Sequence, residues 1–262
     1  MSMVQAEQAL QEALSAYDFG GTVESTSRFG EGHINDTFRV DAQRPDGSVC
    51  RSILQRVSPV AFKEPDKLME NIVNVTEHLS REITRLGGDP TRETLSVLRT
   101  RDGAASVTDS TGGVWRAFPF VEGTVCYQSA ETPELFAASG RAFGRFQRLL
   151  RDYPAHTLHE TIPRFHDTEN RLQNLKNAVA ADPLGRAKDC REDIAFMLAR
   201  EKDCSAALSA LREGTLPLRV THNDTKLNNV LMDEKTGEAL CVIDLDTVMP
   251  GLSINDFGDS IR

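Results

Sequence analysis

Long apolar runs and runs of basic residues are both missing from this 262-residue sequence. A membrane-spanning helix needs about 20 consecutive apolar residues, and no stretch approaches that length. The first 17 residues lack the basic start and apolar centre of a signal peptide and have the pattern of an amphipathic helix instead. Net charge is −9, and without a basic cluster a nucleic-acid-binding surface is not expected. These absences predict a cytoplasmic protein that binds neither membranes nor nucleic acid.

Cysteine is also scarce, with five residues in the whole chain. The number is odd and no two cysteines have CxxC spacing, which argues against a disulfide framework and against a zinc site. The composition is that of an ordinary globular protein, with 39% hydrophobic and 26% charged residues. A chain of this length can bury the core of one large domain or of two modest ones.

The most informative stretch covers residues 220–246. Two short apolar runs, 230–232 and 240–243, are separated by a polar turn, which predicts a hairpin of two buried strands. Polar residues stand where these strands begin and end. They are His222, Asp224, Asn229, Asp244 and Asp246. The hairpin should therefore bring two carboxylates and an amide oxygen together.

Such a set suits phosphoryl transfer, in which the protein supplies positioning and charge stabilisation. An aspartate can accept the proton of the attacking hydroxyl, and the remaining carboxylate and amide oxygens are ligands that Mg²⁺ prefers. The nucleotide's phosphates would complete the coordination of the metal. Asp and Asn also cap turns, and for any single residue here that is the commoner role. The ordered set favours the catalytic interpretation.

The order His-x-Asp, then Asn, then Ile-Asp after a second strand resembles the protein-kinase-like phosphotransferases. It is more closely similar to the aminoglycoside phosphotransferase and choline kinase superfamily, and within it to the N-acetylhexosamine 1-kinases. The resemblance implies that Asp224 is the catalytic base and that Asn229 and Asp244 bind Mg²⁺. It makes Lys226 and Asp246 weaker substrate-site candidates, Asp246 being either a support for the metal site or the start of the next loop.

A second resemblance in the same region is misleading. Residues 256–258 spell Asp-Phe-Gly, the metal motif of protein kinases. The metal-binding aspartate should follow the strand after the catalytic loop, and Asp244 already holds that position. The resemblance to the superfamily implies instead that Asp256 braces the catalytic loop.

The amino-terminal part predicts three antiparallel strands over residues 22–26, 34–40 and 49–57, with a turn at residues 46–47. Between the first two lies a glycine-containing segment with Gly30, Gly32, His33 and Asn35. Glycines let a backbone approach phosphate oxygens and donate amides to them. Taken alone, such a segment is more often an ordinary hairpin, and Asn35 stands where a third glycine is usual. Ahead of a kinase-like hairpin, it is interpreted as a phosphate-binding loop.

The resemblance also implies a cation on the third strand and a partner on the following helix. The third strand offers Arg56 instead of the usual lysine, although an exposed strand arginine is the alternative. The helix is predicted over residues 64–86, and its Glu70, or else Glu77, would pair with Arg56. Solvent exposure explains either glutamate as well.

Strands are predicted at residues 95–99 and 114–120, and helices at 134–151, 163–181 and 183–212. In kinase-like folds the chain after the last of these strands binds adenine through its backbone, which makes Phe120 and Val121 candidate contacts. Residues 165–168, with Arg171, resemble a segment of the N-acetylhexosamine 1-kinases. There, His166 and Asp167 would either face the sugar or cap a helix.

Together these features predict an α+β, protein-kinase-like fold with a sheet-based lobe at residues 1–121 and a helical lobe at 122–262. The resemblance implies an ATP- and Mg²⁺-dependent kinase that acts on the anomeric hydroxyl of N-acetylhexosamines, and a carboxy-terminal lobe that is incomplete at Arg262. Another small-molecule acceptor, such as choline, homoserine, methylthioribose or an aminoglycoside, is the alternative. A non-catalytic nucleotide-binding module is a third possibility. The oligomeric state is left open.

Overall fold

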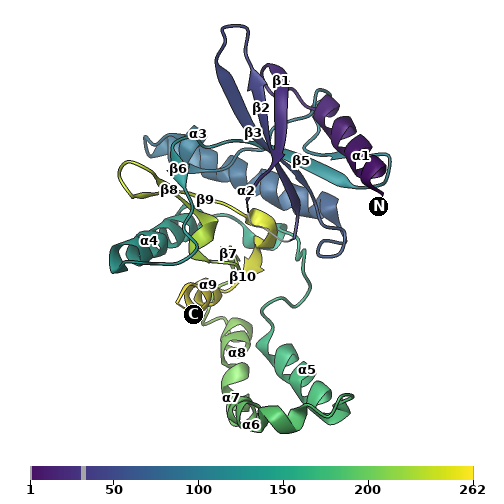
Figure 1. The fold of residues 1–262 in the computed structure, drawn as a ribbon. Coiled ribbons are helices and arrows are strands. Elements are labelled where there is room, and N and C mark those ends of the chain that lie inside the picture. Colours follow the sequence, from purple (N-terminus) through teal and green to yellow (C-terminus); the bar gives the residue numbers. More distant parts are fainter. Residues whose placement is uncertain (1, 31–33, 262) are drawn as a thin grey trace.

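A five-stranded antiparallel sheet forms the amino-terminal part of the chain in the computed structural model, which describes residues 2–30 and 34–261. The strand order is β1-β2-β3-β5-β4 (Figure 1). The strands are β1 (Thr22–Arg28), β2 (Asp36–Gln43), β3 (Val49–Arg56), β4 (Val107–Thr108) and β5 (Val114–Pro119). The three strands expected within residues 22–57 are present, and β2 pairs with β3 along its whole length.

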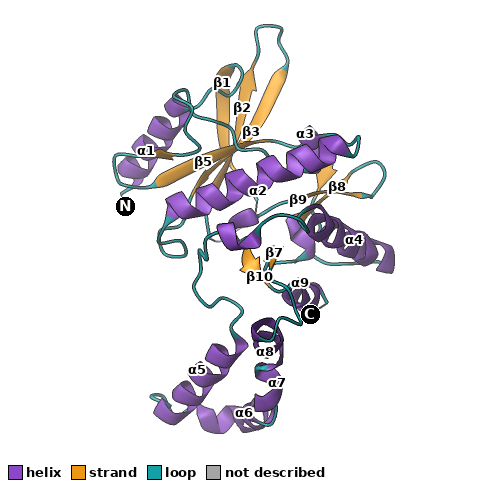
Figure 2. Ribbon diagram, turned by 180° about the vertical axis from the view of Figure 1, so that it is seen from behind, coloured by secondary structure: helices purple, strands orange, loops and turns teal. Residues whose placement is uncertain are grey.

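Helices cover both faces of this sheet. α1 (Met3–Ala16) packs on one face with Leu54 and Ala117, and α2 (Pro65–Arg85) covers the other with Phe118 (Figure 2). Because successive strand residues point to opposite faces, neighbouring residues of β5 enter different cores. This division decides which side chains of β3 and β5 can face the rest of the molecule.

The predicted hairpin is present in the carboxy-terminal part. It consists of β8 (Val230–Asp233) and β9 (Ala239–Val242), and β6 (Thr124–Val125) pairs with the free edge of β8. A second small sheet joins β7 (Arg219–Thr221) to β10 (Met249–Gly251). The surrounding elements are α3 (Pro90–Glu93), α4 (Pro133–Leu149) and α9 (Ser253–Ser260). Buried residues of α2, α4, β8 and β9 share one hydrophobic core.

The single helix expected over residues 183–212 is wrong. The chain forms a group of short helices that extends away from the rest of the molecule in both views (Figures 1 and 2). They are α5 (Thr168–Ala181), α6 (Arg191–Leu198), α7 (Glu201–Cys204) and α8 (Ala206–Arg212). None of the residues in α6, α7 or α8 is buried. Tertiary packing supplies most helical stability in proteins, and these segments have little of it to hold one long helix.

The strand expected at residues 95–99 is also wrong. Only Leu98 makes a bridge, to Ala117, and the edge of β5 pairs with β4 instead. This short apolar run does contribute to the core, because the side chains of Leu95 and Val97 pack against it beside α2. No helix in the described part of the chain is both long and apolar enough to cross a membrane.

Candidate active site

The loop between β7 and β8 is held in place by a buried histidine. His222 is fully buried, with the rings of Phe143 and Phe146 packed against it. Its Nδ1 accepts from the backbone N–H of Asp224 at 3.3 Å, so its Nε2 carries the proton and donates to the carbonyl of Ile243 at 2.9 Å. The ring thereby joins the loop that carries Asp224 to the residue before Asp244.

Asp224 is half-buried, and one of its two carboxylate oxygens is already engaged. Oδ2 lies 2.9 Å from the Nζ of Lys226 and accepts from the Nδ2 of Asn229 at 3.1 Å. Asn229 also donates to the Asp224 carbonyl at 2.8 Å, which fixes the orientation of its amide group. The described residues provide no hydrogen-bond partner for Oδ1 of Asp224. That oxygen is therefore available to an incoming hydroxyl.

Asn229 and Asp244 lie next to each other because the hairpin pairs their neighbours. Val230 is opposite Val242, and the Ile243 N–H donates to the Asn229 carbonyl at 2.9 Å. Among the described residues, neither the Asp244 carboxylate nor the Oδ1 of Asn229 has a hydrogen-bond or ion-pair partner. Two unengaged groups with hard oxygen atoms, on residues that the hairpin makes neighbours, suit a magnesium ion that takes its remaining ligands from phosphates and water. No group of three or more His, Cys, Asp or Glu side chains within the described residues could hold a metal by itself.

The Asp244 carboxyl has a raised pKa. Desolvation by the surrounding protein is the largest cause, and the negative charge of Asp246 adds to it; His222 and Arg116 act in the opposite direction. The backbone of Asp244 is left-handed, with φ of 59°. This strained, charge-crowded position is the kind that persists at functional sites, where a bound cation would compensate for it.

Asp256 supports the catalytic loop from below, in α9. Its buried carboxylate accepts from the backbone N–H groups of His222 at 2.9 Å and Asn223 at 2.8 Å, and from the Nε2 of Gln147 at 2.8 Å. Its own carbonyl accepts from the hydroxyl of Thr225 at 2.8 Å. The Asp-Phe-Gly sequence therefore has no place at the metal-binding oxygens and supports the loop instead.

We expect Asp256→Asn to destabilise the protein by about 3 kcal/mol, because an amide group offers a donor where the loop presents buried donors. Urea unfolding would measure the change. Asp152→Asn is the matched control: this carboxylate is 80% exposed and pairs with the exposed Arg151, and its loss should cost under about 0.5 kcal/mol. Equal unfolding free energies for the two variants would contradict the bracing role of Asp256.

The expected pairing of Arg56 with Glu70 or Glu77 is wrong. The Nε of Arg56 lies 3.2 Å from the Oδ2 of Asp109. Glu70 is exposed and pairs with His159, and Glu77 pairs with Arg99. Arg56 points to the α1 face of the sheet because it shares that face with Leu54, whereas Gln55 points to the other face.

On α2, the residue that contacts the carboxy-terminal part of the chain is Asn71, which directly follows Glu70. Asn71 is buried, its Nδ2 donates to the carbonyls of His159 at 2.8 Å and Val248 at 3.1 Å, and its Oδ1 accepts from the His159 N–H at 2.8 Å. The sequence contained the signal, because Asn71 lies on the apolar face of the helix with Leu68 and Ile72, and Glu70 lies on the opposite face.

The cation on the catalytic side of the sheet is Arg116 of β5, which the sequence analysis missed. It is directly opposite Gln55 in the strand register and only 2% exposed. Its Nη1 lies 2.5 Å from the Oδ1 of Asp246. Asp246 is thus the partner of a buried arginine.

The glycine-containing segment lies only partly within the described residues. Gly32 and His33 are outside them. Gly30 has φ of 76°, a left-handed conformation that favours glycine. The side chain of Asn35 is engaged by the protein, since its Nδ2 donates to Asp246 at 2.7 Å and its Oδ1 accepts from the Ser58 N–H at 2.9 Å. Gly30 and Asn35 both line a recess of about 310 Å³ at the end of β1.

The segment that follows β5 lies close to this recess. Phe120 contacts Phe29 edge to face, with ring centroids 5.6 Å apart. Val121 is buried, and its carbonyl accepts from the hydroxyl of Thr124 at 2.8 Å. Adenine contacts by Phe120 and Val121 remain a prediction.

The two candidate sugar contacts have different surroundings. His166 is half-buried, and its Nε2 lies 3.2 Å from the carbonyl of Asn223, directly beside Asp224. Asp167 caps α5, accepting from the Asn170 N–H at 2.8 Å, and also pairs with Arg164 at 2.7 Å. Asp167 therefore has the helix-capping role that was the alternative for it, and the geometry leaves His166 beside the catalytic loop.

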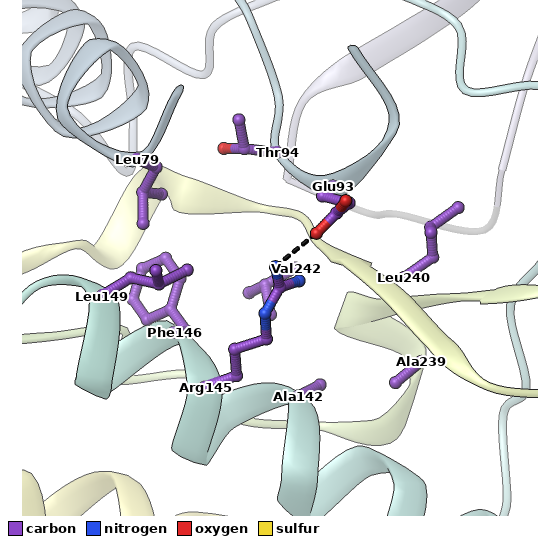
Figure 3. Close-up of a pocket in the computed structure, with 10 residues that line it drawn as sticks. All are labelled: Leu79, Glu93, Thr94, Ala142, Arg145, Phe146, Leu149, Ala239, Leu240 and Val242. Atoms are coloured by element: carbon purple, nitrogen blue, oxygen red, sulfur yellow. Dashed lines mark hydrogen bonds and ion pairs between the residues drawn. The ribbon is translucent and has the colours of Figure 1, made fainter. Parts of the chain in front are cut away.

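A separate cavity is lined by residues of α2, α3, α4 and β9 (Figure 3). Its volume is about 30 Å³, the space of one water molecule. An ion pair between Glu93 and Arg145 crosses it, above Phe146 and Val242 (Figure 3). None of the predicted site residues lines this cavity, which is too small for a nucleotide.

Residues 25–262 match the model of the phosphotransferase enzyme family, APH. The chain belongs to this family. The α+β, protein-kinase-like fold expected from the sequence is confirmed.

Solved structures of small-molecule kinases share this fold. The amicoumacin kinase hAmiN, solved with AMP-PNP, Ca²⁺ and Ami, superposes with a TM-score of 0.61 at 15% identity over 97% of this chain and 67% of that one. An aminoglycoside phosphotransferase from Alicyclobacillus acidocaldarius gives 0.57 at 17% identity, over 96% and 70%. Aminoglycoside 2'-phosphotransferase-IIIa, a GDP complex, gives 0.57 at 12% identity, over 96% and 75%. At these identities the likeness concerns the fold.

Proposed function

We propose that this phosphotransferase uses ATP and Mg²⁺ to phosphorylate the anomeric hydroxyl of N-acetylglucosamine or N-acetylgalactosamine. The observation that carries the proposal is the state of three side chains on one hairpin. Asp224 has one oxygen fixed and one free, and the oxygens of Asn229 and Asp244 beside it are unengaged. Residues 1–121 would hold the nucleotide and residues 122–262 would supply this hairpin.

The proton has a defined path in this arrangement. Lys226 and Asn229 hold Oδ2 of Asp224, so Oδ1 accepts the proton as the sugar hydroxyl attacks the γ-phosphorus. The bond between the β,γ-bridging oxygen and the γ-phosphorus breaks, and ADP leaves. Asn229 and Asp244 would hold Mg²⁺, which when bound would supply positive charge against that of the phosphates. The Asn229–Asp224 hydrogen bonds keep the base and the metal ligand in one fixed relation.

A neutral acceptor is supported by the charge beside the base. Lys226 places an ammonium group 2.9 Å from the Asp224 carboxylate. That group would repel the ammonium groups of choline or an aminoglycoside, whereas an acetylated sugar carries no charge. The resemblance of residues 165–168 to the N-acetylhexosamine 1-kinases points the same way, and His166 of that segment lies against the catalytic loop.

ADP release from Mg²⁺-ATP should be measured with N-acetylglucosamine, N-acetylgalactosamine, choline, homoserine, methylthioribose and kanamycin. We expect activity with the two acetylated sugars alone, with loss of their reducing-end reactivity because the anomeric oxygen becomes phosphorylated. The 1-deoxy analogue of N-acetylglucosamine, which lacks that hydroxyl, is the matched control. Phosphorylation of the analogue would refute the anomeric position, and activity confined to another acceptor would replace the substrate. Nucleotide binding without transfer to any acceptor would support a non-catalytic module.

A further inference from the structure

A buried polar network connects the five-stranded sheet to the loop that carries Asp244. At its centre, Arg116 and Asp246 are 2% and 5% exposed and form the ion pair at 2.5 Å. The Nε and Nη2 of Arg116 donate to the Oε1 of Gln55 at 3.0 and 2.9 Å. The second oxygen of Asp246 accepts from Asn35, which is held in turn by the Ser58 N–H.

This network joins three strands to one point. Asn35 directly precedes β2 and Arg116 is in β5, and both contact Asp246 in the short 3₁₀ helix Leu245–Thr247. Gln55 of β3 is connected to Asp246 through Arg116. Burying a carboxylate and a guanidinium costs desolvation that their attraction often only offsets, so such a pair adds little net stability. The pair instead fixes the relative positions of Arg116 and Asp246, because a buried charge separated from its partner would be left uncompensated.

The point that the network fixes is two residues from the metal-binding carboxylate. Asp244 is held from one side through Ile243, which is hydrogen-bonded to Asn229 and His222. The hydrogen bond from Asn35 and the ion pair with Arg116 hold the other side, at Asp246. The left-handed backbone of Asp244 lies between these two attachments. Loss of the Asp246 attachment would leave that backbone free to relax and move the carboxylate.

We propose that Asn35, Asp246 and Arg116 form a positioning unit that holds Asp244 where it can bind Mg²⁺ and aligns it with the nucleotide-facing sheet. The inference rests on the proposed function only in requiring a bound Mg²⁺-nucleotide, and it holds for any acceptor. Arg116 is a positioning residue here, too deeply buried to contact a phosphate. The unit replaces the expected pairing of Arg56 with Glu70.

The test is binding of a non-hydrolysable ATP analogue by calorimetry, in EDTA and across a Mg²⁺ titration. We expect Asn35→Ala and Asp246→Asn to raise the Mg²⁺ concentration for half-saturation about tenfold, the usual effect of removing a support of a metal ligand. In EDTA, without Mg²⁺, the affinity of both variants for the ATP analogue should equal that of the wild type. The double variant should need no higher Mg²⁺ concentration for half-saturation than Asp246→Asn alone, because both substitutions weaken the same support of Asp244.

Arg56→Gln is the matched control: like Asp246→Asn it breaks an ion pair made by an arginine of the same sheet, but this pair lies on the α1 face. It should lower the melting temperature and leave the Mg²⁺ concentration for half-saturation within about twofold of the wild-type value.

The proposal would be overturned if Asn35→Ala and Asp246→Asn both shifted the melting temperature without changing the Mg²⁺ concentration for half-saturation. If Asp246→Asn fails to fold, Asn35→Ala decides, because Asn35 is only half-buried. A wild-type protein without Mg²⁺-dependent nucleotide binding would overturn this unit and the proposed function together, whereas binding without sugar transfer would overturn only the latter.

Discussion

Asp224→Asn should lower kcat by about 10³-fold, the range for loss of a positioned general base. The substitution preserves size, and the amide oxygen can still face Lys226 and Asn229, where Oδ2 now lies. Its NH₂ group would then occupy the position of Oδ1 and could not accept a proton. Affinity for the Mg²⁺-nucleotide should change little, because Asn229 and Asp244 are intact.

Initial rates and binding of a non-hydrolysable analogue would separate these effects. Glu238→Gln is the matched control: it removes a negative charge from the same hairpin at a position that is 71% exposed and lies far from the site along β9. Its kcat should equal that of the wild type. An Asp224→Asn variant that kept more than a tenth of wild-type kcat would remove Asp224 from the role of base.

Asp244→Asn should abolish turnover and yet make the metal-free protein more stable. The pKa of Asp244 is raised in the folded chain, chiefly by desolvation and then by Asp246. Above the unfolded pKa the folded chain thus holds this carboxyl group at a free-energy cost relative to the unfolded chain, and an uncharged amide of the same shape relieves that cost. Asparagine also accepts the left-handed backbone well. We expect a melting temperature about 2 °C or more above that of the wild type.

The sign of the pH dependence follows from the same shift. Because the folded pKa lies above the unfolded value of about 3.9, the unfolded chain releases this proton first as pH rises. The contribution of Asp244 to stability is therefore full below about pH 4 and declines as pH rises through the folded pKa. The difference in stability between Asp244→Asn and the wild type should therefore be small at about pH 4 and grow as pH rises through the folded pKa.

Ligand should reverse the order of stability. Mg²⁺ and nucleotide at 100 times their dissociation constant would stabilise the wild type by about 2.7 kcal/mol, whereas a variant unable to bind the metal gains far less. Melting curves with and without Mg²⁺ and the ATP analogue would show the crossover. An Asp244→Asn protein that is no more stable than the wild type without metal, or equally stabilised by ligand, would contradict the assignment of Asp244.

Local spacing was sufficient to predict the hairpin and its polar residues. Two apolar runs separated by seven residues can pair in few ways, so Asn229 and the residues after β9 had to become neighbours. The family likewise followed from ordered short segments. Helix periodicity also marked Asn71 as a buried residue, although attention to charge favoured the exposed Glu70.

The partners of the strand residues were set by tertiary structure. Gln55 and Arg56 are both polar, so alternation could not tell which of them faces α1; that depended on Leu54 and Trp115 packing in the α1 core. The network of Arg116, Asp246 and Asn35 spans 211 residues between its ends, and no local pattern encodes it. The sequence by itself determined which groups can perform the chemistry, because their spacing is local. Only the folded chain decided which groups hold them in place, because strands and helices distant in sequence meet there.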